Sequence, residues 1–342
     1  MAPRKQSTAS ATGRTRPPAT IYDVARLSGV SPSTVSRALN KPGRLNGATE
    51  QRIREVAEAV GYRLNPMARA LPTGRTQMIA LILSDITNPV FFELVRGAER
   101  VAASRGYILI LAESQESADL EHRTAQRLLG SVDGLVLVSA RLENTAIRTL
   151  SEQKPLLVVN RRLRGTPSLV PDVGPGIEDA LDHLQELGHS SLAYLAGPAK
   201  SWMSRLREQT LKNAADERGM GVRTIGPNDP TLAGGAAALP ALSGTTASAV
   251  LAYNDLMAIG LLQACQGAGI TVPDDLSIIG FDDIFGSDFT SPPITTIRTP
   301  LGRLGEEAAR RLIASLDDDD TGSAVDLTTE FVIRNSTARV KV

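Results

Sequence analysis

The feature that most constrains the fold is an alternation that starts near residue 77. Short apolar runs rich in Val, Ile and Leu alternate there with longer amphipathic stretches. Such runs indicate strands that are buried on both faces of a parallel sheet covered by helices. The runs fall into two sets, so we predict an α/β body of two lobes, each a doubly wound parallel sheet. The predicted strands cover residues 79–83, 108–111, 135–138, 156–159, 192–195, 222–225, 249–252 and 278–281.

Charge is unevenly distributed along a chain whose formal net charge is zero. Residues 1–75 hold 13 lysines and arginines against 4 acidic residues, a net +9, and the remaining residues hold 24 against 33, a net −9. A basic segment joined to an acidic body favours a nucleic-acid-binding head, although a solvated basic tail would give the same asymmetry. At 342 residues, the chain also exceeds the roughly 250–300 residues of a single core, which predicts several domains.

The segment after the first nineteen residues carries the signals of three short helices. Thr20 opens a capping-box pattern, and Gly29 permits a tight turn before a second helix that Ser31 caps. Asn46 caps a third helix. Two short helices joined by a glycine-containing turn and supported by a third make a helix-turn-helix. We therefore predict an all-α, DNA-reading head over residues 20–64.

The remaining boundaries follow from composition. Residues 1–19 are rich in Ser, Thr, Ala and Pro and hold no acidic residue, so we expect a disordered basic tail. Residues 65–75 predict a hinge helix, with an unstructured linker as the alternative. The body spans residues 76–342, with lobe 1 at about residues 76–186 and 299–326 and lobe 2 at about residues 187–298 and 327–342.

Side chains that directly follow the predicted strands are candidate ligand contacts, because open parallel sheets bind ligands beyond the carboxyl ends of their strands. Their amide, carboxylate and guanidinium forks suit paired hydroxyls, and aromatic rings can cover the apolar face of a sugar. The set predicts a neutral polyhydroxylated ligand and comprises Asn88, Phe91, Asn160, Arg161, Trp202, Arg205, Asn254 and Asp282. The alternative for each Asn and Asp is that it caps the next helix, which we favour for Asp85, Asp255 and Asp283.

Patterns typical of enzymes and metalloproteins are missing. The chain has no Cys/His metal spacing, no GxSxG elbow, no P-loop and no GxGxxG motif that opens a helix, so we expect no catalytic site, metal or cofactor. Among the three histidines, His183 and His189 have structural settings, and Cys265, the only cysteine, suits a packed helix face. No apolar run has the about 18–20 residues of a membrane span, and we see no secretory signal, so we expect a cytoplasmic protein.

Residues 20–40, TIYDVARLSGVSPSTVSRALN, closely resemble the DNA-binding head of the lactose/galactose repressor (LacI/GalR) family of bacterial transcription regulators. Further matches are GYRLNPMARAL at 61–71, DITNPVFFELVRG at 85–97, VDGLVLVS at 132–139, HLQELGHSSLAYLAGP at 183–198, AYNDLMAIGLL at 252–262, LSIIGFDD at 276–283 and PPITTIRTP at 292–300. The resemblance implies a helix-turn-helix head, a hinge helix and a two-lobed core like periplasmic sugar-binding proteins. It also implies a homodimer that binds double-stranded DNA at a near-palindromic operator.

The resemblance places the second helix of the head in the major groove. It implies that Pro32, Ser33 and Arg37 face the bases, where Arg37 can pair bidentately with a guanine. It implies that Leu71 of the hinge enters the minor groove and bends the duplex. The other implied DNA contacts, several of them to phosphates, are Thr20, Tyr22, Ser31, Thr34, Ser36, Asn40, Arg44, Asn65 and Ala68.

In the body, the sugar-contacting positions of the family fall on the strand-end residues chosen above, Trp202 excepted. Three departures leave the particular ligand open. Val90 takes the first of two places that are often aromatic, and Asn160 stands where Asp is common. No aromatic residue lies near Pro230, and we expect Trp202 to supply that stacking surface.

These observations predict a ligand-responsive, sequence-specific regulator that represses carbohydrate-utilisation genes under a sugar-like effector, in the cytoplasm and associated with the nucleoid. A family member that responds to a non-sugar effector such as a nucleobase is one alternative. A transport-linked sugar-binding protein is another, against which the helix-turn-helix and the missing secretory signal argue. The missing nucleophile–base set argues against an enzyme on the same layers, and the lack of apolar heptads near the last residue favours a dimer over a tail-tethered tetramer.

Overall fold

The computed structural model describes residues 19–40, 43–62, 74–317, 319 and 325–341. The chain divides into two compact units between Gly74 and Arg75. The predicted tail, apart from its last residue, and the predicted hinge up to residue 73 lie outside the described residues.

The first unit contains the three predicted helices, α1 (Ile21–Ser28), α2 (Pro32–Asn40) and α3 (Gly47–Ala59). The capping box is present: the Thr20 hydroxyl accepts from the Asp23 amide, and the Asp23 carboxylate accepts from the Thr20 amide. Gly29 ends α1 at φ 69°, a left-handed conformation that glycine adopts without steric cost. Asn46 caps α3 by accepting from the Ala48 amide. These local predictions are confirmed.

The core of this unit is made by one face of each helix. Its six buried apolar side chains recur at helical spacing and fix how α2 packs on the other two helices. They are Val24, Ala25, Val35, Ala38, Ile53 and Ala57.

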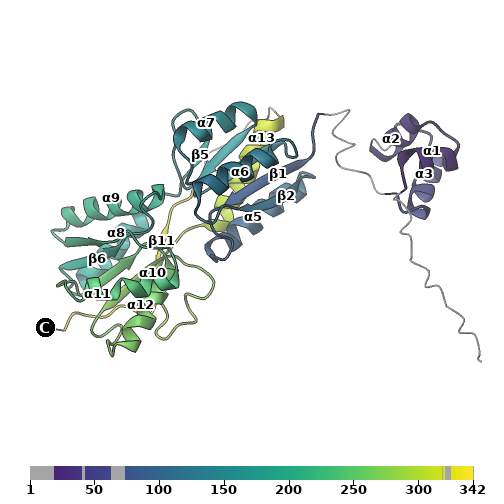
Figure 1. The fold of residues 1–342 in the computed structure, drawn as a ribbon. Coiled ribbons are helices and arrows are strands. Elements are labelled where there is room, and N and C mark those ends of the chain that lie inside the picture. The colour runs from purple at the N-terminus through teal and green to yellow at the C-terminus, as the bar shows by residue number, and fades with distance from the viewer. Residues whose placement is uncertain (1–18, 41–42, 63–73, 318, 320–324, 342) are drawn as a thin grey trace, which may run out of the picture. The chain divides into compact units, whose positions relative to one another are not determined.

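Lobe 1 of the second unit is built on a five-stranded, fully parallel sheet of order β2-β1-β3-β4-β5 (Figure 1). Its strands are β1 (Met78–Leu83), β2 (Ile108–Glu113), β3 (Gly134–Val138), β4 (Leu156–Val159) and β5 (Ser168–Leu169). Its helices are α5 (Val90–Ser104), α6 (Ala118–Leu128), α7 (Asn144–Gln153) and α13 (Leu301–Asp317).

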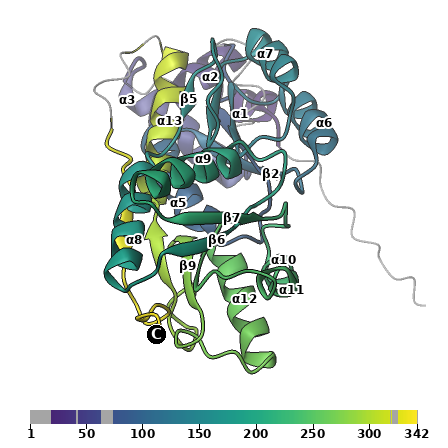
Figure 2. The ribbon, with the colours of Figure 1, turned by 90° about the vertical axis from the view of Figure 1, so that its left-hand side faces the viewer.

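The two faces of this sheet bury different layers, as the period of two in a strand requires. Along β1, Ile79 and Leu81 pack in one cluster with residues of α5 and α13, whereas Ala80 and Ile82 pack in another with residues of α6 and α7. Helix α13 is the last helix among the described residues, yet it lies against α5, as its yellow ribbon beside the blue one shows in Figures 1 and 2.

Lobe 2 is built on a six-stranded sheet of order β11-β10-β9-β8-β6-β7, parallel except for the edge strand β11. Its strands are β6 (Ser191–Leu195), β7 (Gly221–Ile225), β8 (Ala249–Ala252), β9 (Ser277–Asp282), β10 (Thr295–Arg298) and β11 (Glu330–Val332). Its helices are α8 (Gly174–Glu186), α9 (Trp202–Glu217), α10 (Leu232–Ala237), α11 (Leu239–Leu242) and α12 (Asp255–Gly267).

All eight predicted strands are present, and the structure adds β5, β10 and β11. These three escape sequence reasoning because they are short and carry polar residues, so they show neither an apolar run nor a clear period of two. One predicted boundary is wrong. Helix α8 packs in the core of lobe 2, with Ile177 and Leu181 fully buried there, so the chain crosses between lobes before Gly174 rather than after residue 186.

Candidate functional site

Helix α2 of the head presents two different faces. Val35 and Ala38 are buried, whereas Ser33 and Arg37 are exposed on the opposite side. This arrangement follows from the helical period, since residues three and four apart share a face. The exposed face therefore holds a hydroxyl and a guanidinium that a DNA groove can reach.

The other head residues predicted to contact DNA differ in exposure. Tyr22 and Arg44 are exposed, and Pro32, Thr34 and Ser36 are half-buried.

A second group of predicted head contacts is already engaged in local hydrogen bonds. The Ser31 hydroxyl lies 2.8 Å from the hydroxyls of both Ser33 and Thr34, and the Thr20 hydroxyl belongs to the capping box. The side chain of Asn40, together with Asn65, Ala68 and Leu71, lies outside the described residues.

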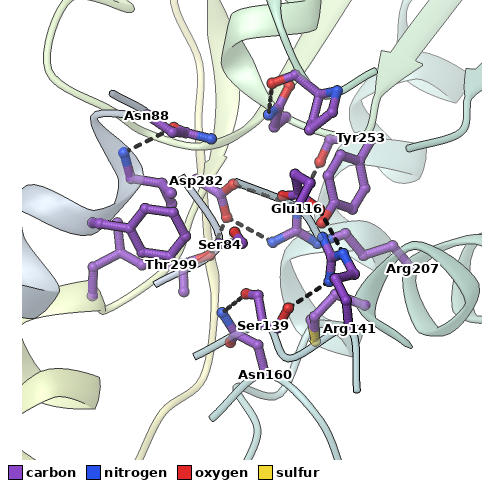
Figure 3. A pocket seen from close by; sticks show the side chains of 16 residues that line it. Ser84, Asn88, Glu116, Ser139, Arg141, Asn160, Arg207, Tyr253, Asp282 and Thr299 are labelled. Carbon is purple, nitrogen blue, oxygen red and sulfur yellow. Dashed lines mark hydrogen bonds and ion pairs between the residues drawn. The ribbon is translucent and has the colours of Figure 1, made fainter. Parts of the chain in front are cut away.

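In the second unit, a cavity lies where the carboxyl ends of strands from both lobes meet, as expected for parallel α/β sheets. The cavity is small, with a volume of about 40 Å³ (Figure 3). Its lining mixes hydroxyl, amide and charged groups with a few apolar side chains. These are Ser84, Asn88, Val90, Phe91, Glu116, Ser139, Arg141, Asn160, Met203, Arg207, Pro230, Tyr253, Asn254, Asp282, Thr299 and Leu301.

The backbone around this cavity is unusual. Seven described non-glycine residues have positive φ, and six of them lie at or just after strand ends near the cavity. Four of the six line it: Glu116 (56°), Ser139 (56°), Asn160 (61°) and Asp282 (101°). Such conformations are uncommon for non-glycine residues and cluster at functional sites, where the surrounding structure holds them in place.

The lobe 2 wall of the cavity contains a buried ion pair. Arg207 of α9 donates from Nη2 to Asp282 Oδ1 at 2.6 Å, and both side chains are only 7% exposed. The guanidinium lies 3.6 Å from the centre of the Phe281 ring and 5.0 Å from that of Tyr253. Thr299, between β10 and α13, donates to the same Asp282 oxygen. The pair is therefore held by aromatic and hydroxyl contacts inside the core.

The lobe 1 wall contains a second pair. Arg141 donates from Nε to Glu116 at 2.5 Å, and Asn160 donates to the Ser139 hydroxyl at 3.1 Å. With one guanidinium and one carboxylate from each lobe, the formal charges that line the cavity balance.

Beneath the lobe 2 wall lies Asp255, which is fully buried. It accepts hydrogen bonds from the Thr296 hydroxyl at 2.6 Å and from the Ile284 amide at 2.8 Å. Burial disfavours the charged form and raises the pKa of Asp255 to about 8, against the opposing effect of these two bonds. This carboxyl is therefore largely protonated at neutral pH.

Comparison with known proteins identifies this arrangement. A family model described as "Bacterial regulatory proteins, lacI family" matches residues 20–65, and one described as a "Periplasmic binding protein-like domain" matches residues 181–337. The HTH-type transcriptional repressor CytR of Escherichia coli K12 is 33% identical over 330 residues, which covers 93% of this chain and 96% of CytR. The chain belongs to the LacI family. It is a transcription regulator with a helix-turn-helix DNA-binding domain and a ligand-binding domain.

Other LacI-family proteins support the same assignment. The HTH-type transcriptional regulator DegA of Bacillus subtilis is 32% identical over 337 residues, covering 93% of this chain and 98% of DegA. The lac repressor dimer bound to operator and the anti-inducer ONPF has a TM-score of 0.83 at 25% identity, over 94% of this chain and 99% of that one. The CelR–cellobiose complex has a TM-score of 0.69 at 28% identity, over 93% and 99%.

Five of the eight predicted effector residues of this LacI-family chain line the cavity: Asn88, Phe91, Asn160, Asn254 and Asp282. One qualification concerns Asn254. Its side chain accepts from the Met257 amide and donates to the Pro230 carbonyl, so it also caps α12.

The other three predicted effector residues do not line the cavity. Arg205 is exposed and donates to the Ala199 carbonyl. Arg161 donates to the carbonyls of Ala140 and Leu142 in lobe 1.

Trp202, the third, lies instead in a separate hollow with Leu206 and Thr210, the residues one and two turns further along α9. The predicted stacking role of Trp202 is therefore wrong for this cavity. Tyr253, directly after β8, supplies an aromatic side chain instead.

Arg207 is the main residue that sequence reasoning missed, although a signal was present. Met203, Arg207 and Leu211 are spaced by four and are all buried on one face of α9. Arg205, two residues away from Arg207, points about 200° around the helix and so faces solvent. Helical periodicity could therefore have distinguished the two arginines. Arg141 and Glu116 carried no such signal, because they meet only through the folding of two loops.

The three aspartates expected to cap helices have other roles. Asn254, not Asp255, is the N-cap of α12. Asp85 accepts hydrogen bonds from the Thr87 amide and hydroxyl rather than from the first amides of α5. Thr87 itself lies three residues before this helix begins. Asp283 forms ion pairs with Arg298 and Arg334. The following backbone runs into turns instead of helices at these last two positions, which a capping argument cannot foresee.

The predicted structural residues have partners inside lobe 2. His183 bonds to the Thr337 hydroxyl, and His189 bonds to the Ser248 hydroxyl and the Ala338 carbonyl. Over the part of the chain that the structure describes, no group of three His, Cys, Asp or Glu side chains is placed to hold a metal ion.

Proposed function

We propose that the cavity between the lobes binds a neutral, sugar-like effector and that this binding controls repression of carbohydrate-utilisation genes. The observation that carries this proposal is the charge balance of the lining, with hydroxyl and amide groups around two guanidinium–carboxylate pairs. A neutral polyol pairs with such forks, whereas an anionic ligand leaves a buried charge without a counterion. Two related proteins of known structure hold neutral sugars, ribose in a regulator from Enterococcus faecium and cellobiose in CelR.

The test is a thermal-shift screen of the full chain with neutral sugars, sugar phosphates and nucleobases. A neutral sugar at 100 times its Kd should stabilise the folded protein by about 2.7 kcal/mol. Arg207→Gln should abolish the shift, and the matched control Arg205→Gln should retain it because Arg205 lies outside the cavity. A thermal shift with nucleobases alone would favour a non-sugar effector over the proposed sugar.

The proposed DNA contacts centre on Arg37, which is exposed on the free face of α2. Arg37→Ala should lower affinity for a specific operator by about 1–3 kcal/mol, the usual discrimination of one bidentate guanine contact. Effector binding should be unchanged. Fluorescence anisotropy at about 0.15 M salt, against a scrambled duplex of the same length, measures the specific part.

The control is Arg26→Ala on α1, which removes one exposed charge from the same unit. Equal losses of affinity for specific and scrambled duplexes in Arg37→Ala would show a phosphate contact and refute base reading. We also propose that Asn65, Ala68 and Leu71 contact DNA from a hinge helix. Bending of the duplex tests these roles, since a residue in the minor groove should affect it.

We propose that the unit that binds DNA is a homodimer on a near-palindromic operator. The support is the structural likeness to the lac repressor dimer bound to operator. Effector binding then shifts the equilibrium between lobe arrangements by its difference in affinity for them. Sedimentation of the chain with and without a palindromic duplex tests the dimer.

We propose a cytoplasmic location and no catalytic activity, because the similar curated proteins are transcription regulators. None of the described helices is long and apolar enough to cross a membrane. Turnover of any sugar in the panel would contradict the regulator-only proposal, and recovery of the chain outside the cytoplasm would favour a transport-linked binding protein.

A further inference from the structure

The lobe 1 wall holds a guanidinium whose hydrogen bonds are only partly used. The side chain of Arg141 is 4% exposed and lines the cavity. Its Nε donates to Glu116, and its Nη1 donates to the Ser139 carbonyl at 2.6 Å (Figure 3). Its Nη2 has no partner within the described parts of the chain. Among the described side chains, the buried nitrogen and oxygen atoms without a partner are Thr166 Oγ1 and Arg207 Nε. Arg141 Nη2 is therefore accessible to solvent in the cavity, where a ligand oxygen can replace water as its acceptor.

The backbone under Arg141 is held in place by another acid. Glu121 of α6 accepts from the main-chain amides of Arg141 and Leu142, at 2.7 Å and 3.2 Å. Glu121 is almost fully buried, and this burial raises the pKa of its carboxyl. The loop that carries Arg141 is therefore tied to α6, and the guanidinium is oriented before any ligand arrives.

Glu116 reaches Arg141 from a backbone conformation that is uncommon for its residue type. Gln115 and Glu116 have φ of 49° and 56°. A side chain that only neutralised a surface charge would not need this conformation, whereas conformations of this kind persist where the fold holds a functional group in one position. Glu116 remains 29% exposed, so it meets both Arg141 and the solvent side of the cavity.

We propose that Arg141, paired with Glu116, determines the specificity of the effector site. Arg141 Nη2 donates to a hydroxyl or carbonyl oxygen on the side of the effector that faces lobe 1. Glu116 keeps this wall neutral, so that an uncharged oxygen is preferred over a carboxylate or phosphate at that position. This inference rests on the proposed function, because it needs a sugar-like ligand in the cavity.

The charge balance predicts that one substitution can invert the preference for neutral over anionic ligands. With Glu116 present, an anionic group facing lobe 1 adds an uncompensated charge to the wall. Replacing Glu116 by an uncharged isostere leaves the Arg141 cation alone, and an anionic group then supplies the missing partner. A residue that acted only on folding would change the affinity for neutral and anionic ligands alike.

The experiment measures binding to the full chain by isothermal titration calorimetry with matched probe pairs. The pairs are glucose with glucuronate, galactose with galacturonate, and ribose with ribose 5-phosphate, beside cellobiose. Wild type should prefer the neutral member. In Glu116→Gln the ratio of anionic to neutral affinity should rise by about tenfold or more, as expected for one unbalanced charge near the ligand.

A second variant tests the arginine itself. Arg141→Gln should weaken binding of the neutral probe by about tenfold, with Arg141→Lys restoring part of it because the charge and one donor return. Circular dichroism and the melting temperature establish that each variant is folded.

The control is Glu93→Gln, which removes the acid of an Arg–Glu pair on the exposed side of α5, where Arg96 lies 3.1 Å away. Its anionic-to-neutral ratio should equal that of wild type. If wild type binds a neutral probe but Glu116→Gln leaves the ratio unchanged, the inference is wrong and the proposed function stands. If wild type binds no sugar of the panel, both the proposed function and this inference are wrong.

Discussion

The two walls of the cavity contain the same chemistry in different degrees of enclosure. In lobe 2, Arg207 and Asp282 are both 7% exposed, and the guanidinium lies against the rings of Phe281 and Tyr253. In lobe 1, Arg141 is as deeply buried, but its partner Glu116 is 29% exposed. The lobe 2 pair is therefore part of the core, whereas the lobe 1 pair keeps one member near water.

The difference in exposure predicts different responses of the two pairs when one partner is removed. A pair enclosed by aromatic rings relaxes little when a partner is removed, because little water reaches the remaining charge. A pair with one solvated member can relax, so its partners can change at lower cost. We infer that lobe 2 provides a fixed anchor and that lobe 1 provides the adjustable recognition surface.

The largest expected effect is on lobe 2. Arg207→Gln leaves Asp282 buried without its cation and should lower the free energy of unfolding by about 3–5 kcal/mol. Urea denaturation followed by the fluorescence of Trp202, the only tryptophan, measures it. Arg205→Gln, two residues away and exposed, should stay within about 0.5 kcal/mol of wild type. Equal unfolding free energies for the two variants would show that the enclosed pair contributes no more to stability than the exposed Arg205.

The next effect is a pH dependence that belongs to the same wall. The pKa of Asp255 is raised to about 8 in the folded protein, above its ordinary value of 3.8. Its contribution to stability is therefore fully present below pH 3.8 and is lost as the pH rises toward and through 8.

Asp255→Asn should remove this pH dependence. The difference in unfolding free energy between wild type and Asp255→Asn should fall by a few kcal/mol from about pH 4 to pH 8, as a shift of this size implies. Urea titrations at several pH values check it. A difference that does not change with pH would show that Asp255 is ionised in the folded state.

A smaller effect is expected on lobe 1. Arg141→Gln should cost about 1–3 kcal/mol, the range for an unmade buried bond, because the freed Glu116 can turn toward solvent. The same denaturation assay measures it, with Arg96→Gln as the exposed-pair control at about 0–1 kcal/mol. A loss as large as that of Arg207→Gln would show that the two walls are equally rigid.

Features that rest on neighbouring residues could be predicted from the amino-acid sequence alone. The capping box at Thr20, the left-handed turn at Gly29 and the cap at Asn46 all have their signals within four residues of their effect. Six of the eight predicted strands were readable for a related reason, because burial on both faces requires uninterrupted apolar runs. The other two, β2 and β7, are partly exposed edge strands. The LacI-family resemblance then followed from motifs spread over the chain.

Which polar side chains share the cavity depends on tertiary packing. Arg205 and Arg207 look alike in the sequence, and the packing of α9 selects the second. Glu116 and Arg141 are 25 residues apart and meet because two loops follow parallel strands that end at the same edge. Adjacent aspartates diverge for the same reason: Asp282 lines the cavity, while Asp283 pairs with Arg298 and Arg334 outside its lining. Local signals specify where a strand ends, but the direction of each side chain beyond that end depends on contacts from distant parts of the chain.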